Sequence, residues 1–207
     1  MIDEQVDTKT RLLDTAEKLF GKNGFDATSL RDITAGAQVN LAAVNYHFQS
    51  KESLIDAVIE RRMEPVNQKR IQMLDAAGPS ATVEQIIEAF LAPILDQEIW
   101  QAGPLIGRVF SNPDQFLERF FKKRLAAVAQ RFRDAIAQAL PDLPVEEILW
   151  RLHFMAGSMS HVLVFSQVLP AMTGGLCNPQ DRDALMTRLV TFLAAGFRSP
   201  APRLEKN

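Results

Sequence analysis

The segment VNLAAVNYHFQSKESL, residues 39–54, carries side chains that suit contact with a nucleic acid. The amide of Asn45 offers a donor and an acceptor that can pair with the edge of adenine, and the methyl groups of Ala42 and Ala43 can touch those of thymine. Such small side chains also let a helix approach a duplex closely. This part of the segment therefore predicts contact with base edges.

The same segment offers three side chains to the phosphate backbone. Tyr46, His47 and Lys51 can each donate a hydrogen bond to a phosphate oxygen. Ser50 is a predicted N-cap, so Lys51 falls in the first turn of a helix, where exposed N–H groups favour anions. Two plainer interpretations stay open: Asn45 could cap or solvate its helix, and His47 could hold that helix against the next one.

These side chains need a helix that is fixed on its other face. Leu41, Val44 and Phe48 fall within one arc of a helix, so we expect all three to pin it to the first helix of the pair. The connection GAQV (36–39) is as short as a turn that sets two helices at a steep angle. The pattern predicts a helix-turn-helix.

The preceding elements have readable ends. Apolar residues at helical spacing predict a first helix over about 8–23, and Gly24 is positioned to end it in the left-handed conformation. Thr28 or Ser29 can cap a second, short helix that ends near Gly36.

Helical periodicity continues through the remainder of the chain, and no stretch alternates steadily between apolar and polar residues. The predicted fold class is all-α, with about nine helices and no sheet. Residues 1–54 would form a three-helix helix-turn-helix domain, and residues 55–207 a larger domain for ligand binding and dimerisation. The helices expected in the second domain follow a long helix from Ser50 that is kinked at Pro65, and cover about 83–99, 104–111, 114–140, 145–169 and 180–197.

Composition limits the class of protein. The chain has 207 residues with 47% hydrophobic content, which suffices for real cores, and a formal net charge of -2, so any contact with DNA must come from local placement of side chains. It has no readable secretory signal and no run of about 20 apolar residues, so we expect a cytoplasmic protein without a membrane partner.

The single cysteine, Cys177, is either an inert thiol or a redox sensor. The three histidines are dispersed, so we expect no metal and no other cofactor.

The run TRLLDTAEKLFGKNGFDATSLRDITAGAQVNLAAVNYHFQSKESLIDAVIE resembles the DNA-binding region of TetR-family transcriptional regulators, including the YHFQSKESL signature near its end. The resemblance implies that Arg31 reads a base from the second helix, although Arg31 could instead pair with Asp26 or Asp32. Many members carry an aromatic residue where this chain has Asn45, so its base preference need not follow theirs. The implied DNA contacts are Thr28, Ser29, Arg31, Leu41, Ala42, Ala43, Asn45, Tyr46, His47 and Lys51.

Two later segments suit association between helices. Small residues thin one surface of WRLHFMAGSMSHVLVF, and LMTRLVTFLAAGF adds a second stripe. Such stripes also occur as ordinary intrachain core. The resemblance implies that these last two helices form a four-helix interface with the same pair of a second chain, making a homodimer. The candidate dimer residues are Ala156, Gly157, Ser160, Leu189, Phe192, Leu193 and Gly196.

The middle helices contain more large, deformable apolar side chains than a dimerisation scaffold needs. An apolar cavity among them would suit a small lipophilic effector, while a fully packed core is the plainer interpretation. Arg108 could pair with a carboxylate or with the phosphates of a thioester, or only with Asp114 or Glu118. The candidate ligand residues are Met63, Phe90, Ile94, Arg108, Phe110, Phe154, Met155 and Met159.

The sequence thus predicts a ligand-responsive transcriptional repressor that binds a near-palindromic DNA operator as a dimer and is not an enzyme. The segment LPVEEILWRLHFMAGSMSHVL resembles fatty-acid-responsive members, which favours a fatty acid or acyl thioester as effector, followed by an aromatic compound. Two rivals remain. One is a helical enzyme or lipid-binding protein whose N-terminal helices are only scaffold, and the other is an activator or a constitutive regulator without an effector.

Overall fold

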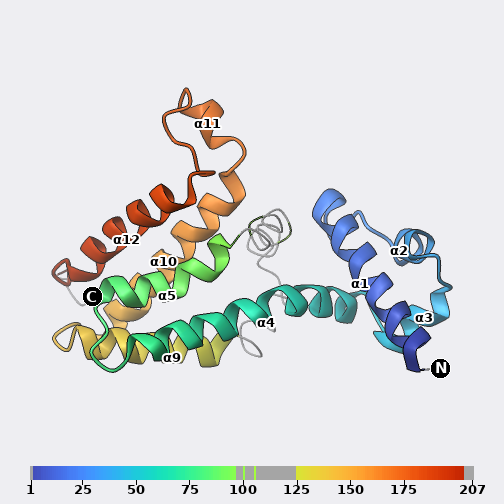
Figure 1. Ribbon diagram of the computed structural model, residues 1–207, viewed down its shortest axis with the longest axis horizontal. Helices are drawn as coiled ribbons and strands as arrows, with labels where there is room; N and C mark the ends of the chain where they lie inside the picture. Colours follow the sequence, from blue (N-terminus) through green and yellow to red (C-terminus); the bar gives the residue numbers. More distant parts are fainter. Residues whose placement is uncertain (1, 97–99, 101–104, 106–124, 203–207) are drawn as a thin grey trace, which may run out of the picture. The chain divides into compact units, whose positions relative to one another are not determined.

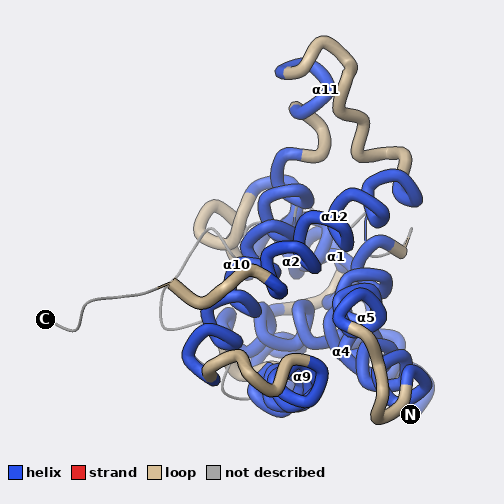
Figure 2. The backbone as a smooth tube through the Cα atoms, turned by 90° about the vertical axis from the view of Figure 1, so that its left-hand side faces the viewer, coloured by secondary structure: helices blue, strands red, loops and turns tan. Residues whose placement is uncertain are grey.

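The computed structural model describes residues 2–96, 100, 105 and 125–202, and the side chains from Thr8 onward. This part of the chain contains nine helices and no strand, which confirms the all-α prediction (Figure 2). The chain divides into two compact units, whose helices can be followed in Figure 1. Among the described residues, the first unit contains 2–65 and 105, and the second contains 66–96, 100 and 125–202.

The first unit holds the three helices expected at the N-terminus. α1 begins earlier than predicted because the sequence IDEQVD before Thr8 contains no residue that stops a helix, and it ends as expected before Gly24, whose φ is 91°. The unit boundary falls inside the fourth helix, after Pro65, rather than at the predicted Leu54. The bounds are α1 (Ile2–Asn23), α2 (Leu30–Ala37), α3 (Leu41–His47) and α4 (Lys51–Ala77).

One apolar cluster holds these helices together. α1 contributes Leu12, Ala16 and Phe20, which are fully buried. Val44 of α3 and Phe48, the residue that follows α3, are 0% and 6% exposed. Burial of side chains of this size stabilises the folded state by about 1.5–3 kcal/mol each. Burial of Val44 and Phe48 in this cluster therefore stabilises the position of α3 on α1.

Leu41 does not join this cluster, so the expectation that it pins α3 is wrong. Its side chain is 45% exposed. Helical side chains lean back over the preceding turn, and Leu41 is the first residue of α3, where no such turn exists.

Ion pairs tie α1 to the first half of α4. Arg61 donates to Asp14 at 2.6 Å and to Glu17 at 2.5 Å, and Arg62 also donates to Glu17. Because the Glu17 side chain is only 14% exposed, this network is better shielded from solvent than an isolated surface pair.

The second unit consists of the last part of α4 and five further helices. The predicted helix over 104–111, apart from residue 105, and the first part of the one over 114–140 lie outside the described residues, and the short α11 was not expected. The bounds are α5 (Val83–Leu95), α9 (Ala126–Ala139), α10 (Val145–Phe165), α11 (Leu169–Met172) and α12 (Arg182–Arg198). α12 packs on α5, and α9 and α10 complete the same core.

Polar contacts at both ends show that α5 and α12 run antiparallel. Arg198 at the end of α12 pairs with Glu84 at the start of α5, where its hydrogen bond lowers the pKa of Glu84 to about 2. Arg182 at the start of α12 donates to the carbonyl oxygen of Leu95, at the end of α5, at 3.2 Å.

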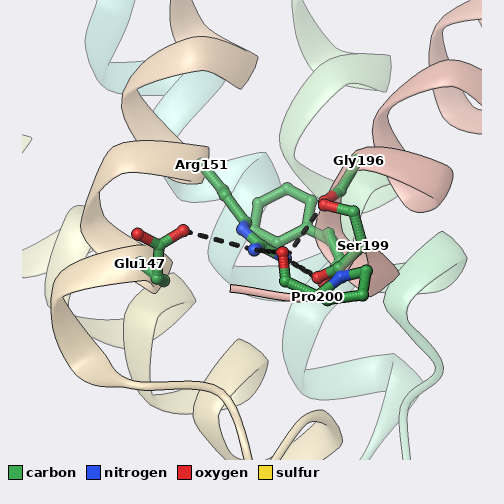
Figure 3. A network of polar contacts seen from close by, with 6 residues as sticks. Glu147, Arg151, Gly196, Ser199 and Pro200 are labelled. Atoms are coloured by element: carbon green, nitrogen blue, oxygen red, sulfur yellow. Dashed lines mark hydrogen bonds and ion pairs between the residues drawn. The ribbon is translucent and has the colours of Figure 1, made fainter. Parts of the chain in front are cut away.

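A buried arginine closes the end of α12 (Figure 3). Arg151 of α10 is 7% exposed and donates to the carbonyl oxygens of Phe197 and Ser199 at 2.7 and 2.8 Å. Its other terminal nitrogen donates to the Glu147 carboxylate at 3.2 Å. The last carbonyls of a helix have no partner within the helix, so this cation satisfies them and complements the helix dipole.

We expect the contact between α1 and α2 to depend on the absence of a side chain at Gly36. A Cβ there would lie 2.7 Å from the Cγ2 methyl of Thr15. Gly36→Ala should cost about 1–3 kcal/mol through overpacking, against about 1 kcal/mol gained from helix propensity. In a Thr15→Ser background the methyl is gone, and the same change should stabilise the protein.

Thermal or denaturant unfolding of the two single variants and the double variant measures this coupling. Additive effects would show that α1 and α2 do not approach as closely as described.

Candidate functional site

The start of α2 is fixed by a capping box. Ser29 is the N-cap: its hydroxyl accepts from the Asp32 amide at 3.2 Å, and the Asp32 carboxylate accepts from the Ser29 amide at 2.9 Å. The bonds from Ser29 hold the pKa of Asp32 below its ordinary value, so this contribution to stability is present at neutral pH and is lost as the pH falls through the lowered pKa. Ser29 itself remains exposed at the helix N-terminus, where an anion is favoured.

Thr28 does not offer its side chain to DNA, which corrects the expectation for this residue. It is fully buried, and its hydroxyl donates to the Gly24 carbonyl oxygen at 2.7 Å. Thr28 instead fastens the loop between α1 and α2. The alternative caps of α2 are thereby resolved in favour of Ser29.

The turn between α2 and α3 is held in a left-handed conformation. Gln38 has φ 55° and donates its backbone N–H to the carbonyl oxygens of Thr34 and Ala35. Arg11 of α1 donates to the carbonyl oxygen of Ala37 and, at 3.2 Å, to that of Gln38. Non-glycine residues adopt this conformation at a cost, which these bonds offset. The turn therefore sets the direction of α3 rather than leaving it free.

The outer face of α3 is largely exposed to solvent. Ala42, Asn45 and Tyr46 are exposed, Tyr46 at 70%, while Ala43 and His47 are half-buried. The Tyr46 and His47 rings meet edge to face with centroids 5.0 Å apart. This face therefore combines small residues, an amide and two aromatic hydrogen-bond donors.

The joint between α3 and α4 places Lys51 beside this face. The Phe48 amide donates to the Val44 carbonyl oxygen at 2.8 Å, and the Ser50 amide donates to that of Phe48 at 2.8 Å, so the chain turns sharply. Ser50 then caps α4, since its hydroxyl accepts from the Ser53 amide at 3.1 Å. Lys51 is consequently the first residue of α4, and only a short turn separates it from His47 at the end of α3.

Arg31 is exposed on α2. Within the described part of the chain, no ion pair joins Arg31 to Asp26 or to Asp32, whose carboxylate accepts from Ser29. The first unit thus brings Ser29, Arg31, the outer face of α3 and Lys51 onto helices that share one core.

The candidate ligand residues separate into groups. Ile94, Met155 and Met159 are buried in the second unit, and Phe90 is half-buried with its ring edge to face with Phe132. Met63 is buried but belongs to the first unit. Arg108 and Phe110 lie outside the described residues. Phe154 is 58% exposed and stacked on Trp150, so it belongs to the surface of α10 rather than to the interior.

Sequence reasoning missed Arg70, the largest fully buried side chain of the described residues. A signal was present, because Val66, Arg70 and Leu74 recur at four-residue steps on one face of α4, and the two flanking residues are buried.

The candidate dimer residues divide into exposed, half-buried and buried groups. Gly157, Phe192 and Gly196 are exposed, Phe192 at 71%. Ala156 and Ser160 are half-buried. Leu189 and Leu193 are 8% and 5% exposed, so they serve the core within the chain and not its surface.

Among the described residues, no three His, Cys, Asp or Glu side chains gather in a way that could hold a metal ion. One helix of this part of the chain, α10, is long and apolar enough to cross a membrane by length and composition, with a mean hydropathy of 1.2 over its best window.

The described site is that of a helix-turn-helix regulator, and the comparisons agree. The family model described as "Bacterial regulatory proteins, tetR family" matches residues 12–58. The model described as "Tetracyclin repressor-like, C-terminal domain" matches residues 88–196. The chain therefore belongs to the TetR family of transcriptional regulators. Regulators of this family bind DNA and act as dimers, and they are not enzymes.

Individual relatives resemble the chain over most of its length. The HTH-type transcriptional regulator UidR of Escherichia coli (strain K12) is 28% identical over 195 residues, covering 85% of this chain and 96% of UidR. The HTH-type transcriptional repressor BepR of Brucella suis is 28% identical over 211 residues, covering 96% and 95%. A solved transcriptional regulator from Aquifex aeolicus VF5 has a TM-score of 0.64 at 21% identity, covering 91% and 98%, which shows the shared fold. None of these three is described as responding to a fatty acid, so membership of the fatty-acid-responsive branch stays a prediction.

Lys51→Ala and Asn45→Ala should weaken DNA binding in different ways. Loss of a phosphate contact at Lys51 should lower affinity for all sequences alike and reduce the salt slope by about 1. Loss of the Asn45 amide should relax preference at one base position by about 1–3 kcal/mol.

Fluorescence anisotropy on the preferred duplex, on single-base variants of it and at several salt concentrations distinguishes the two effects. Lys69→Ala, which removes an exposed positive charge from the second unit, is the matched control and should behave as wild type. Equal losses on every duplex for both Asn45→Ala and Lys51→Ala would contradict the division between base and phosphate contacts.

Proposed function

We propose that this TetR-family regulator is a repressor that binds a near-palindromic operator as a dimer and is released by a small lipophilic effector. α3 would enter the major groove, with Asn45 and Arg31 on base edges and Tyr46, His47, Ser29 and Lys51 on phosphates. A cytoplasmic location follows from contact with chromosomal DNA.

The main support for this proposal is that α3 packs against the core of the first unit on one face and is exposed to solvent on the opposite face. Val44 and Phe48 are buried in the core of the first unit, whereas Ala42, Asn45 and Tyr46 face solvent. A helix fixed on one side can insert its other side into a groove without losing its own packing. Affinity then depends on these local groups, because the chain carries a net charge of -2.

An exposed apolar stripe supports the dimer. Trp150, Phe154, Gly157 and Phe165 follow one another at three- and four-residue steps or their multiples along α10, and all are exposed. A Cβ at Gly157 would meet no heavy atom within 4 Å, so packing inside the chain does not require glycine there. Glycine within a helix costs about 1 kcal/mol relative to alanine, which a close contact with a second chain would offset.

Gly157→Leu should therefore raise the dissociation constant of the dimer tenfold or more, which corresponds to about 1.4 kcal/mol. The added side chain would hold the two chains apart and leave the monomer folded. Ala127→Leu, on an exposed position of α9, is the matched control. Sedimentation equilibrium measures the constant, and an unchanged value for Gly157→Leu would remove α10 from the proposed interface.

α4 is the element through which an effector would act. Its residues up to Pro65 belong to the first unit and those from Val66 onward to the second. Proline removes one backbone hydrogen bond from a helix interior, so the boundary coincides with the place where α4 bends most easily. A ligand that favours one bend would change DNA affinity by its difference in affinity for the two states.

Selection of bound duplexes from a genomic library tests the proposal most broadly. We expect a near-palindromic site, and the genes beside it indicate the class of effector. Failure of the purified dimer to prefer any sequence over bulk DNA would overturn the proposal. Retention of the operator in the presence of every lipophilic compound tested would instead favour a constitutive regulator.

We prefer a repressor to an activator because BepR, which matches 96% of this chain, is described as a repressor. Placement of the selected operator over or upstream of a promoter decides between the two.

A further inference from the structure

Arg70 is a buried guanidinium in the second unit. It lies on the last part of α4 and is 2% exposed. Burying an ionised side chain is unfavourable unless a charged partner or a full set of hydrogen bonds compensates it. The role of Arg70 therefore depends on which groups compensate its positive charge.

The acceptors of Arg70 among the described residues are all neutral. Nε donates to the carbonyl oxygen of Phe90 at 2.8 Å, and Nη1 donates to the side-chain oxygen of Asn67 at 3.2 Å. Nη2 reaches only the thioether sulfur of Met159, at 3.8 Å. A guanidinium has five N–H donors, and a thioether is a weak acceptor. Within the described residues, no carboxylate pairs with this cation.

Arg151 shows what compensation looks like in the same unit. It too is buried, yet it donates to a carboxylate, Glu147, and to carbonyl oxygens at the negative end of α12. Among the described residues, Arg70 has neither kind of partner. Burial lowers the pKa of Arg70 to about 9, which leaves it mostly cationic at neutral pH while opposing its charge.

Apolar and deformable groups surround this cation. The Phe90 ring lies 3.9 Å from Cζ, in the arrangement of a cation–π contact, and Phe132 packs edge to face on that ring. Met159 borders Nη2. Methionine adapts its shape readily, so its displacement would expose the terminal N–H groups without moving a helix.

We propose that Arg70 binds the carboxylate of an organic acid whose apolar body lies among Phe90, Phe132 and Met159. The inference rests on the proposed release by a small lipophilic effector and specifies its chemistry. A carboxylate matches the planar donors of a guanidinium in a bidentate pair, and it supplies the charge that the described residues do not. An acyl thioester fits less well, because its thioester carbonyl is neutral and a 2%-exposed guanidinium cannot face bulky, hydrated phosphates.

The test compares acids with their neutral methyl esters, using dodecanoate and 4-butylbenzoate as probes. Wild type should bind at least one acid about tenfold or more tightly than its ester, and that acid should release the operator at correspondingly lower concentration. Arg70→Met should lose this preference while binding the ester as wild type does. Arg133→Met removes a cation from α9 outside this cluster and is the matched control, which should keep the preference.

Operator binding and far-ultraviolet circular dichroism verify that Arg70→Met is folded. Should it not fold, Arg70→Lys keeps the charge without the planar donors and should reduce the preference for the acid. An undiminished preference in the folded variants, no preference in wild type, or tighter binding of dodecanoyl thioester than of dodecanoate would overturn the assignment. Binding of acids and esters that leaves the operator occupied refutes the proposed release and not the role of Arg70 in binding.

Discussion

The apolar anchoring of α3 is the interaction on which the site depends. A helix of seven residues is not stable by itself in water, so it persists only because tertiary contacts hold it. Val44 and Phe48 provide those contacts with α1, and the turn at Gln38, fastened by Arg11, fixes the angle at which α3 leaves α2. The side chains left outside are thus presented in one orientation, which a reader of base edges requires.

The second unit contains two buried arginines whose surroundings differ. The positive charge of Arg151 is paired with a carboxylate and with helix-end carbonyl oxygens, whereas the described partners of Arg70 are all neutral. Arg151 closes α12 and stabilises the unit, whereas Arg70 lies among apolar groups and no described carboxylate neutralises its charge. A structural core would be more stable with an apolar side chain at such a position. Stability sacrificed at one buried position is characteristic of binding sites, and this position lies on α4, whose first residue is Lys51, a proposed phosphate contact.

Much of the first unit could be predicted from sequence, since helical periodicity and capping residues are local signals. They located Val44, Phe48 and the cap at Ser50 correctly. Leu41 and Thr28 were misjudged because periodicity ignores helix ends and cannot see a hydroxyl turned toward a carbonyl oxygen.

In the second unit, packing between distant segments decides which side chains turn inward. Stripes of apolar residues were visible, but Leu189 and Leu193 are buried within the chain, while Phe154 and Phe192 stay exposed. Arg70 escaped notice because a charged residue in a sequence is expected to face solvent.

Methylation interference on the selected operator tests the central claim, that α3 of each chain in a dimer reads the major groove. The account predicts that methylation of guanine N7, in the major groove, blocks binding at two inverted half-sites about one helical turn apart. Interference confined to adenine N3 in the minor groove, or to a single half-site, would contradict it.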